Sequence, residues 1–381
     1  MTDLRSIRTD VVGSLLRPDY LMEIWQRHGR GEAGDAELGA AQDQAVREAV
    51  ALQEACGIEV VTDGEYRRLN FQDSFAYSIE GFDADKVSID WYLKEIEGIQ
   101  PLRRWDRPME ERGPAVSQRR PVRERLRLVR NQPLEEYRFV SGVASRPVKV
   151  TLISPDRIWQ RWDYETSTPV YAGPEDFVGH VADIEHEMVR QLVEAGCRYV
   201  QIDAPSYTAY VDGPSLARMR QRGEDPIQSF ARSLKADNTV IQGFPGVTFG
   251  LHLCRGNQRS MWHREGSYDA IAERLFNELA HDRFLLEYDS ERAGSFAPLR
   301  FLPKGKTVVL GLVSTKIPQL ERLEDLRRRI EEASRYAPLE QLAISPQCGF
   351  ASAPPGNAIS ADDQRRKLEL IAEAARRVWG V

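Results

Sequence analysis

Side chains that bind transition metals occur in three separate segments of the chain: His252 and Cys254 in one, Glu287 in the next, and Cys348 near the C-terminus. Because His252 and Cys254 are two residues apart, they would lie on the same face of a strand. One imidazole nitrogen, two thiolates and one carboxylate form a ligand set typical of tetrahedral zinc. The sequence therefore predicts that these four residues bind Zn²⁺.

Each of these residues also has an ordinary structural interpretation. A lone buried cysteine is usually a small hydrophobic residue, so Cys348 by itself would be weak support, whereas the His-x-Cys spacing is a stronger signal. Cys56 and Cys197 each fall between a predicted helix and the next predicted strand, and we expect them to be structural. His263 is a competing ligand in principle, but its place in a loop favours a polar surface role.

The chemistry that such a site performs is thiol activation. A free thiol has a pKa near ~8.5 and is mostly protonated at neutral pH, while only the thiolate attacks. Zinc ionises a coordinating thiol and leaves it nucleophilic. A carboxylate ligand such as Glu287 can yield its place to a substrate sulfur, because catalytic zinc expands its coordination readily. The predicted site therefore favours alkylation of a thiol.

The predicted ligands lie at the ends of strand-like segments. Eight short apolar segments are predicted to be strands: 11–15, 59–65, 147–155, 199–206, 247–254, 283–289, 307–314 and 342–349. Their near-continuous Val, Ile and Leu content suits parallel strands that are buried on both faces. Apolar residues at helical spacing predict helices at 40–57, 174–196, 268–280, 323–337 and 362–380.

This alternation of strands and helices is typical of a (β/α)₈ TIM barrel, here a single domain that spans residues 1–381. The stretch 290–306 has room for only a short helix. An open doubly wound sheet is the alternative, and the count of eight strands favours the barrel. In a barrel the catalytic groups lie where strands end and loops begin, which is where the four metal-binding residues are predicted to lie.

One insertion interrupts the repeat, because residues 66–146 separate the second and third predicted strands. Within it, residues 103–130 contain ten Arg against four Asp or Glu. The segment is either a solvated, charged excursion or a functional element of the loop face. In the second case it would be a lid over the site or a contact between copies of the chain in a homo-oligomer.

The composition limits the classes of protein to which the chain can belong. With 52 Lys and Arg against 58 Asp and Glu, the net charge of −6 argues against a general nucleic-acid partner. No apolar run approaches the ~20 residues of a membrane helix, and the polar N-terminus lacks the apolar stretch of a signal peptide. Four cysteines in 381 residues do not make a disulfide framework. We therefore expect a cytoplasmic protein whose partners are small molecules.

Several segments carry a family resemblance: VVGS (11–14), VVTDGEYRR (60–68), VQIDAPS (200–206), GLHLCRGN (250–257), LLEYDSERAG (285–294), GLVSTK (311–316) and SPQCGF (345–350). Together they resemble the C-terminal catalytic barrel of the cobalamin-independent methionine synthase family, and specifically its short single-barrel relatives. The resemblance covers nearly the whole chain except the insertion. The HxC pair followed by a CG pair in the same order is a specific signal.

The resemblance implies roles for particular residues. The zinc ligands of the family correspond to His252, Cys254, Glu287 and Cys348, in agreement with the spacing argument. The family's pocket for the amino-acid thiol corresponds to Ser14, Glu65 and Asp203. The carboxylates of Glu65 and Asp203 would bind the ammonium group of the substrate, and the same two residues are the candidate catalytic pair. Ser14, with nearby backbone N–H groups, would bind the carboxylate of the substrate. The simpler alternative for Glu65 and Asp203 is a helix cap or a structural ion pair.

Two segments depart from the family pattern. A histidine that follows the seventh strand of methionine synthases is replaced here by Val313-Ser314. A tryptophan that stacks on the pterin after the third strand is replaced by Ile153-Ser154, although Trp159 and Trp162 lie nearby in the sequence. These departures leave the alkyl donor open.

Three functions are compatible with these observations. The first is zinc-dependent methyl transfer to homocysteine, giving methionine, with folate or another compound as donor. The second resembles the related epoxyalkane:coenzyme M transferases, in which a metal-bound thiolate opens an epoxide and arginines of 103–130 would hold a sulfonate. The third is a non-catalytic zinc-binding barrel, which would bind metal without turning over a thiol.

Overall fold

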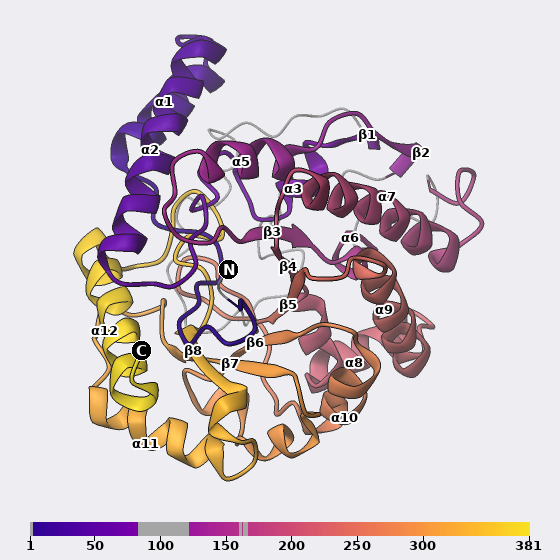
Figure 1. Cartoon of the computed structure of the whole chain (residues 1–381). Coiled ribbons are helices and arrows are strands. Elements are labelled where there is room, and N and C mark those ends of the chain that lie inside the picture. Colours follow the sequence, from indigo (N-terminus) through magenta and orange to yellow (C-terminus); the bar gives the residue numbers. More distant parts are fainter. Residues whose placement is uncertain (1–2, 83–121, 160–161, 163–166) are drawn as a thin grey trace.

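A single parallel sheet forms the centre of the molecule in the computed structural model, which describes residues 3–82, 122–159, 162 and 167–381. Its six strands follow one another in chain order. They are β3 (Val150–Ile153), β4 (Tyr199–Asp203), β5 (Thr248–Leu253), β6 (Arg283–Glu287), β7 (Thr307–Val313) and β8 (Leu342–Pro346). Figure 1 shows these strands as an arc around the N-terminal segment, with helices on the outside.

Only single bridges join the regions of the first two predicted strands, 11–15 and 59–65, to the two edges of this sheet, and the first bridge lies just before its predicted range. Thr9 bridges to Ile344 of β8, and Val61 bridges to Val148 just before β3, both in parallel orientation. One backbone hydrogen bond of 3.1 Å, donated by Leu15, joins the first segment to the second. The parallel α/β sheet is thus confirmed, whereas regular pairing of all eight strands in a closed barrel stays a prediction.

All five predicted helices are present. They are α2 (Asp35–Ala55), α7 (Pro174–Glu194), α10 (Asp269–Glu278), α11 (Leu323–Ser334) and α12 (Ala361–Trp379). A capping box of Ser360 and Asp363 fixes the start of α12. As expected, the stretch 290–306 contains only short turns, η4 (Glu291–Ala293) and η5 (Ala297–Phe301).

The remaining helices were not predicted from the sequence. They are α1 (Asp19–Gly29), α3 (Asp73–Ala76), α5 (Gln132–Ser141), α6 (Pro155–Ile158), α8 (Gly213–Gln221) and α9 (Pro226–Ile241), with the short turns η3 (Pro205–Tyr210) and η6 (Leu339–Gln341). The pair α1 and α2 projects from the body of the molecule (Figure 1). Among the described residues, no helix combines the length and the apolar character needed to cross a bilayer.

The described flanks of the insertion pack against the sheet. They form an antiparallel pair, β1 (Ile79–Phe82) with β2 (Val122–Leu128). Arg68 lies near the start of the insertion, and its buried guanidinium pairs with Glu136 and donates to the Thr151 carbonyl oxygen of β3 at 3.0 Å. Most of the arginine-rich segment, 103–121, lies outside the described residues.

A buried carboxyl group on α7 is expected to lower the free energy of unfolding of the protein. Glu185 is 1% exposed, and neither of its carboxyl oxygens has a hydrogen-bond partner among the described residues. Burial, and after it the nearby Asp237 charge, raise the pKa of Glu185 well above its ordinary range. The folded protein therefore retains a proton that the unfolded chain releases above its normal carboxyl pKa, so this group's contribution to stability falls as the pH rises.

We expect the Glu185→Met variant to be more stable than the natural protein by about 1–3 kcal/mol at neutral pH, because an apolar side chain of similar size replaces an unsatisfied polar group. The difference should grow between pH 5 and pH 8. Denaturant unfolding at several pH values measures it. Asp183→Asn, on the exposed face of the same helix, is the control and should show no such trend. A difference that shrinks with rising pH would contradict the assignment of a buried proton.

Candidate functional site

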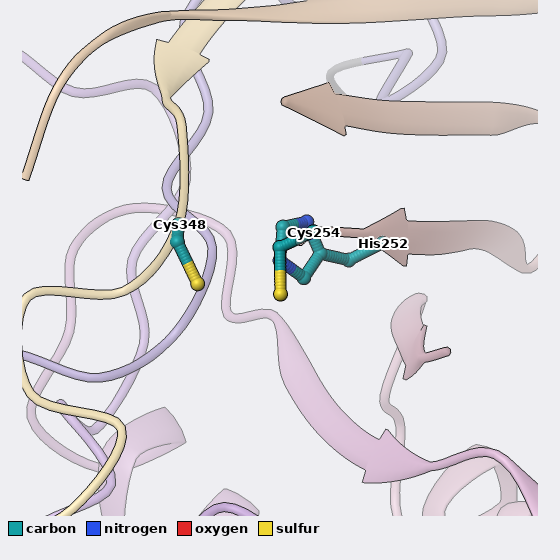
Figure 2. Close-up of side chains that lie close together, drawn as sticks. All are labelled: His252, Cys254 and Cys348. Atoms are coloured by element: carbon teal, nitrogen blue, oxygen red, sulfur yellow. The ribbon is translucent and has the colours of Figure 1, made fainter. Parts of the chain in front are cut away.

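The ends of β5 and β8 bring three of the predicted metal ligands together. The ligand atoms of His252, Cys254 and Cys348 all lie within 4.8 Å of one another, and all three residues are buried. His252 belongs to β5, Cys254 directly follows it, and Cys348 lies in the loop after β8. In Figure 2 the Cys348 side chain points toward Cys254 and His252. Two sulfurs and an imidazole converging in this way form three-quarters of a tetrahedral zinc ligand set.

The imidazole of His252 is held in an orientation that suits a metal ligand. Its Nδ1 lies 3.2 Å from the Leu285 carbonyl oxygen, so Nδ1 carries the proton and donates it. Its Nε2 is buried without a hydrogen-bond partner in the described part of the chain. A metal-binding histidine typically donates its other ring N–H to a carbonyl in this way, which leaves Nε2 as the ligand. The orphaned nitrogen fits a metal ion.

The two cysteine thiols interact with each other. A hydrogen bond from Cys348 lowers the pKa of Cys254 well below its ordinary value, although burial opposes this effect. The same hydrogen bond, together with burial, raises the pKa of Cys348. The pKa values of the two thiols are thus shifted in opposite directions. In contrast, burial raises the pKa of Cys56 to about 11 and that of Cys197 to about 12, which agrees with the structural role expected for both.

Glu287 lies at the end of β6 but outside the group of three. Its carboxylate accepts a 2.6 Å hydrogen bond from the Arg255 backbone N–H and lies 3.2 Å from the Arg292 guanidinium. The side chain is fully buried, and burial raises its pKa. Glu287 as the fourth ligand therefore stays a prediction.

A pocket opens beside these three candidate metal ligands. The lining includes all three residues of the predicted substrate site. They are Ser14, Glu65 and Asp203. The structure thus brings three of the four predicted metal ligands and the three predicted substrate residues to one cavity, at the carboxyl ends of the strands.

Glu65 is held in the pocket by an unusual backbone conformation. Its φ of 58° lies in the left-handed region, which is rare for a residue other than glycine and occurs most often at functional sites. One carboxylate oxygen, Oε1, accepts a 3.0 Å hydrogen bond from Thr151, whereas Oε2 is buried without a partner among the described residues. Gly13 makes room for this side chain, since a Cβ there would lie 2.6 Å from Oε1. Oε2 is free to accept a hydrogen bond from a ligand.

Asp203 is positioned by a buried polar network beneath the pocket. Gln201 donates from Nε2 to Asp203 Oδ1 at 2.7 Å, and its Oε1 accepts from Lys149 at 2.7 Å. Lys149 is itself paired with Asp10 at 2.7 Å. Burial raises the pKa of Asp203 to about 7, while the neighbouring His252 acts in the opposite direction.

Ser14 lies where the first segment meets the loop after β8. Its carbonyl oxygen accepts a 2.8 Å hydrogen bond from the Phe350 N–H, and its Oγ accepts a 3.4 Å hydrogen bond from the Ala351 N–H. Both N–H groups already donate to Ser14, so the group left to bind a carboxylate here is the Ser14 hydroxyl proton.

Several residues that were not predicted from the sequence also line the pocket. Asn70 and Phe71 come from the start of the insertion, Arg157 from α6, and Asn257 from the loop after β5. Of these residues, only Asn257 lies close in sequence to a predicted metal ligand, three residues after Cys254. His263, predicted to be surface, is partly buried and lines the same pocket. The insertion therefore contributes its first residues to the site.

At each of the two positions that depart from the family pattern, a serine donates a hydrogen bond to a carboxylate. Ser314 donates to Asp289 at 2.8 Å, and Ser154 donates to Asp237 at 2.9 Å. Among the described residues, neither serine belongs to the pocket lining. Trp159 and Trp162 stack on each other with ring centroids 5.3 Å apart and also lie outside the lining.

Comparisons with known proteins agree with this site. Residues 172–376 match the sequence model of the cobalamin-independent synthase catalytic domain. The protein YxjH of Bacillus subtilis is 34% identical over 98% of this chain and 94% of its own length. A methionine synthase of Pyrococcus abyssi is 25% identical over 91% of this chain and 87% of its own length.

Solved structures show the same fold. A protein of Listeria monocytogenes, assigned as a vitamin-B12-independent methionine synthase, superposes with a TM-score of 0.73 at 25% identity, covering 98% of each chain. A B12-independent methionine synthase of Shewanella, solved in complex with selenomethionine, superposes with a TM-score of 0.70 at 20% identity, also over 98% of each chain.

Proposed function

Because the chain belongs to the cobalamin-independent methionine synthase family, we propose that it is a zinc-dependent thiol alkyltransferase that methylates homocysteine to methionine. The observation that carries this proposal is the convergence of His252, Cys254 and Cys348 within 4.8 Å beside a pocket with two carboxylates. The donor of the methyl group is left open. A cytoplasmic location fits, because a reducing compartment keeps such thiols free.

His252, Cys254 and Cys348 would hold the zinc ion, with Glu287 as the fourth and most weakly held ligand. Zinc bound there supplies an ionised, nucleophilic substrate thiol at neutral pH. Burial of these residues excludes water and strengthens the electrostatic interactions inside the site.

The protein's own side chains would orient the amino acid. Glu65 Oε2 and the Asp203 carboxylate are the acceptors for the ammonium group, and the Ser14 hydroxyl is the donor for the carboxylate. Held in this way, the substrate sulfur points toward the cysteines. In the reaction, a bond forms between this sulfur and the methyl carbon, the bond between methyl and donor breaks, and the donor keeps the electron pair.

Arg157 favours a second candidate function. This arginine is 8% exposed and lines the pocket, so it places a cation where a sulfonate could bind. A thiol with a sulfonate tail, such as coenzyme M, would then open an epoxide at the same centre. Under this alternative Glu65 and Asp203 would have no ammonium group to bind.

Calorimetric titration of the zinc-loaded protein distinguishes these functions. We expect homocysteine to bind more tightly than coenzyme M, with release of about one proton as its thiol ionises. Heats measured in two buffers of different ionisation enthalpy give the number of protons. Homoserine, which carries a hydroxyl in place of the thiol, is the matched control and should release none. Tighter binding of coenzyme M would favour the second candidate, and binding of neither thiol would contradict both enzymatic functions and favour a non-catalytic zinc-binding barrel.

A further inference from the structure

A buried amide joins the loops that carry the two cysteines. Asn257 lies three residues after Cys254, and its Nδ2 donates a 2.6 Å hydrogen bond to the carbonyl oxygen of Gly349. Gly349 directly follows Cys348. Asn257 is 8% exposed, so this hydrogen bond is largely shielded from water. The side chain thus connects the segments of both thiols across the mouth of the site.

A second layer of hydrogen bonds fixes the amide of Asn257. Its Oδ1 accepts from Asn357 Nδ2 at 2.9 Å and from Lys316 Nζ at 3.0 Å. With its oxygen accepting twice and its nitrogen donating to a carbonyl, the amide has one defined orientation. Asn357 also donates to the Thr315 carbonyl oxygen at 2.9 Å, which ties in the loop after β7.

Lys316 supports this arrangement at a cost. Its ammonium group is 4% exposed and donates to the Gly256 carbonyl oxygen at 2.9 Å as well as to Asn257. Its positive charge also acts on the Glu287 carboxyl at the end of β6. Burial of a cation is unfavourable unless hydrogen bonds and nearby opposite charges replace its contacts with water. Here both acceptors belong to the loop that follows Cys254.

Gly349 is fixed from two further directions. Its carbonyl oxygen lies 3.1 Å from Thr315 Oγ1, whose single proton also has an acceptor in Gln347 Oε1 at 2.8 Å. On the other side, a Cβ at this position would lie only 2.0 Å from Ser14 Oγ, so no larger residue fits. The residue after Cys348 therefore touches both the hydrogen-bonded loops and a predicted substrate residue.

We propose that Asn257 is a positioning residue that sets the separation of Cys254 and Cys348, so that the site is pre-organised for a metal ion. The inference rests on the proposed zinc site. Residues in the layer behind metal ligands typically change metal affinity 10–100-fold when they are replaced. Asn257 acts through the Gly349 backbone, because its nitrogen bonds there and its oxygen is occupied by Lys316 and Asn357.

The rate of zinc release to a chromophoric chelator tests this proposal. We expect the Asn257→Ala variant to release zinc about 10–100-fold faster than the natural protein. Thr315→Val, which removes the hydroxyl shared by Gly349 and Gln347 and keeps the side-chain shape, should release it about fivefold faster. Asn131→Ala is the matched control, because Asn131 is also a buried amide (6% exposed) that bonds to a backbone carbonyl, on Met188. It should release zinc at the natural rate.

Absorption spectra of the Co²⁺-substituted proteins separate positioning from general destabilisation. The sulfur-to-cobalt charge-transfer bands depend on metal geometry, and we expect them to shift in Asn257→Ala but not in Asn131→Ala. If both Asn257→Ala and Thr315→Val release zinc as slowly as the natural protein and show unshifted bands, the positioning role is wrong, while the proposed zinc site stands. If Asn257→Ala fails to fold, Thr315→Val decides the matter by the same two measurements. A natural protein that binds neither zinc nor Co²⁺ would overturn the proposed metal site and the positioning role together.

Discussion

The Cys348→Ser variant is expected to bind zinc more than about 100-fold more weakly than the natural protein, a larger loss than replacement of an outer residue causes. Serine has nearly the same shape, but its hydroxyl stays protonated at neutral pH and offers only a neutral oxygen. The natural residue lies within 4.8 Å of Cys254 and His252 and is 5% exposed, so no water-exposed group can easily take its place. Chelator competition measures the affinity, and elemental analysis gives the stoichiometry.

Cys197→Ser is the matched control for this variant. Cys197 is equally buried, but its thiol contacts the Tyr199 carbonyl oxygen at 3.4 Å rather than the metal-binding group. We expect it to retain one zinc ion with natural affinity. Glu287→Gln tests the fourth ligand separately and should weaken binding less, because the carboxylate is shared with Arg292. Full zinc stoichiometry and affinity in Cys348→Ser would show that the ligand assignment is wrong.

The convergence of His252, Cys254 and Cys348 could be predicted from the sequence because it depends on short-range rules. His252 and Cys254 share a face since side chains alternate along β5, and parallel strands bring their carboxyl ends to one edge of the sheet. The position of Glu287 relative to this group could not be predicted in the same way. Its carboxylate is drawn to the Arg255 N–H and to Arg292, and such competition depends on side-chain contacts that spacing does not reveal.

The first two predicted strands show where apolar patterns mislead. Gly13 interrupts the first segment because the Glu65 side chain passes close to it. In the second, Gly64 and Glu65 have φ values of 70° and 58°, so the chain turns where a strand would continue. Both interruptions lie beside the pocket, so the regular pattern is lost where the predicted substrate residues Ser14 and Glu65 line it.

Helix α9 was missed for a different reason. The segment from Pro226 to Ile241 buries Ser233 and Asp237 along with its apolar residues, so its inward face does not appear apolar in the sequence. Asp237 accepts hydrogen bonds from Tyr207 and Ser154, which makes its burial tolerable. A buried polar network of this kind hides a helix from any method that relies on hydrophobic spacing.

Replacing either pocket carboxylate is expected to lower kcat/KM for homocysteine by about 100–1000-fold, which corresponds to roughly 3–4 kcal/mol for the loss of a charged hydrogen bond in a buried site. The variants are Glu65→Gln and Asp203→Asn, which keep the size of each side chain. Arg68 remains paired with Glu136 when the Glu65 charge is removed, so we expect the fold to persist. Thermal unfolding checks this.

A substrate without the ammonium group provides the control for this prediction. For 4-mercaptobutyrate, which is homocysteine with hydrogen in place of the amino group, both variants should turn over about as fast as the natural protein. The natural protein should prefer homocysteine strongly, and the variants should lose most of that preference. Such a result would assign Glu65 Oε2 and Asp203 to the ammonium group, because only this contact differs between the two thiols. Equal losses for both thiols would mean that the carboxylates act on the metal centre or on the donor instead.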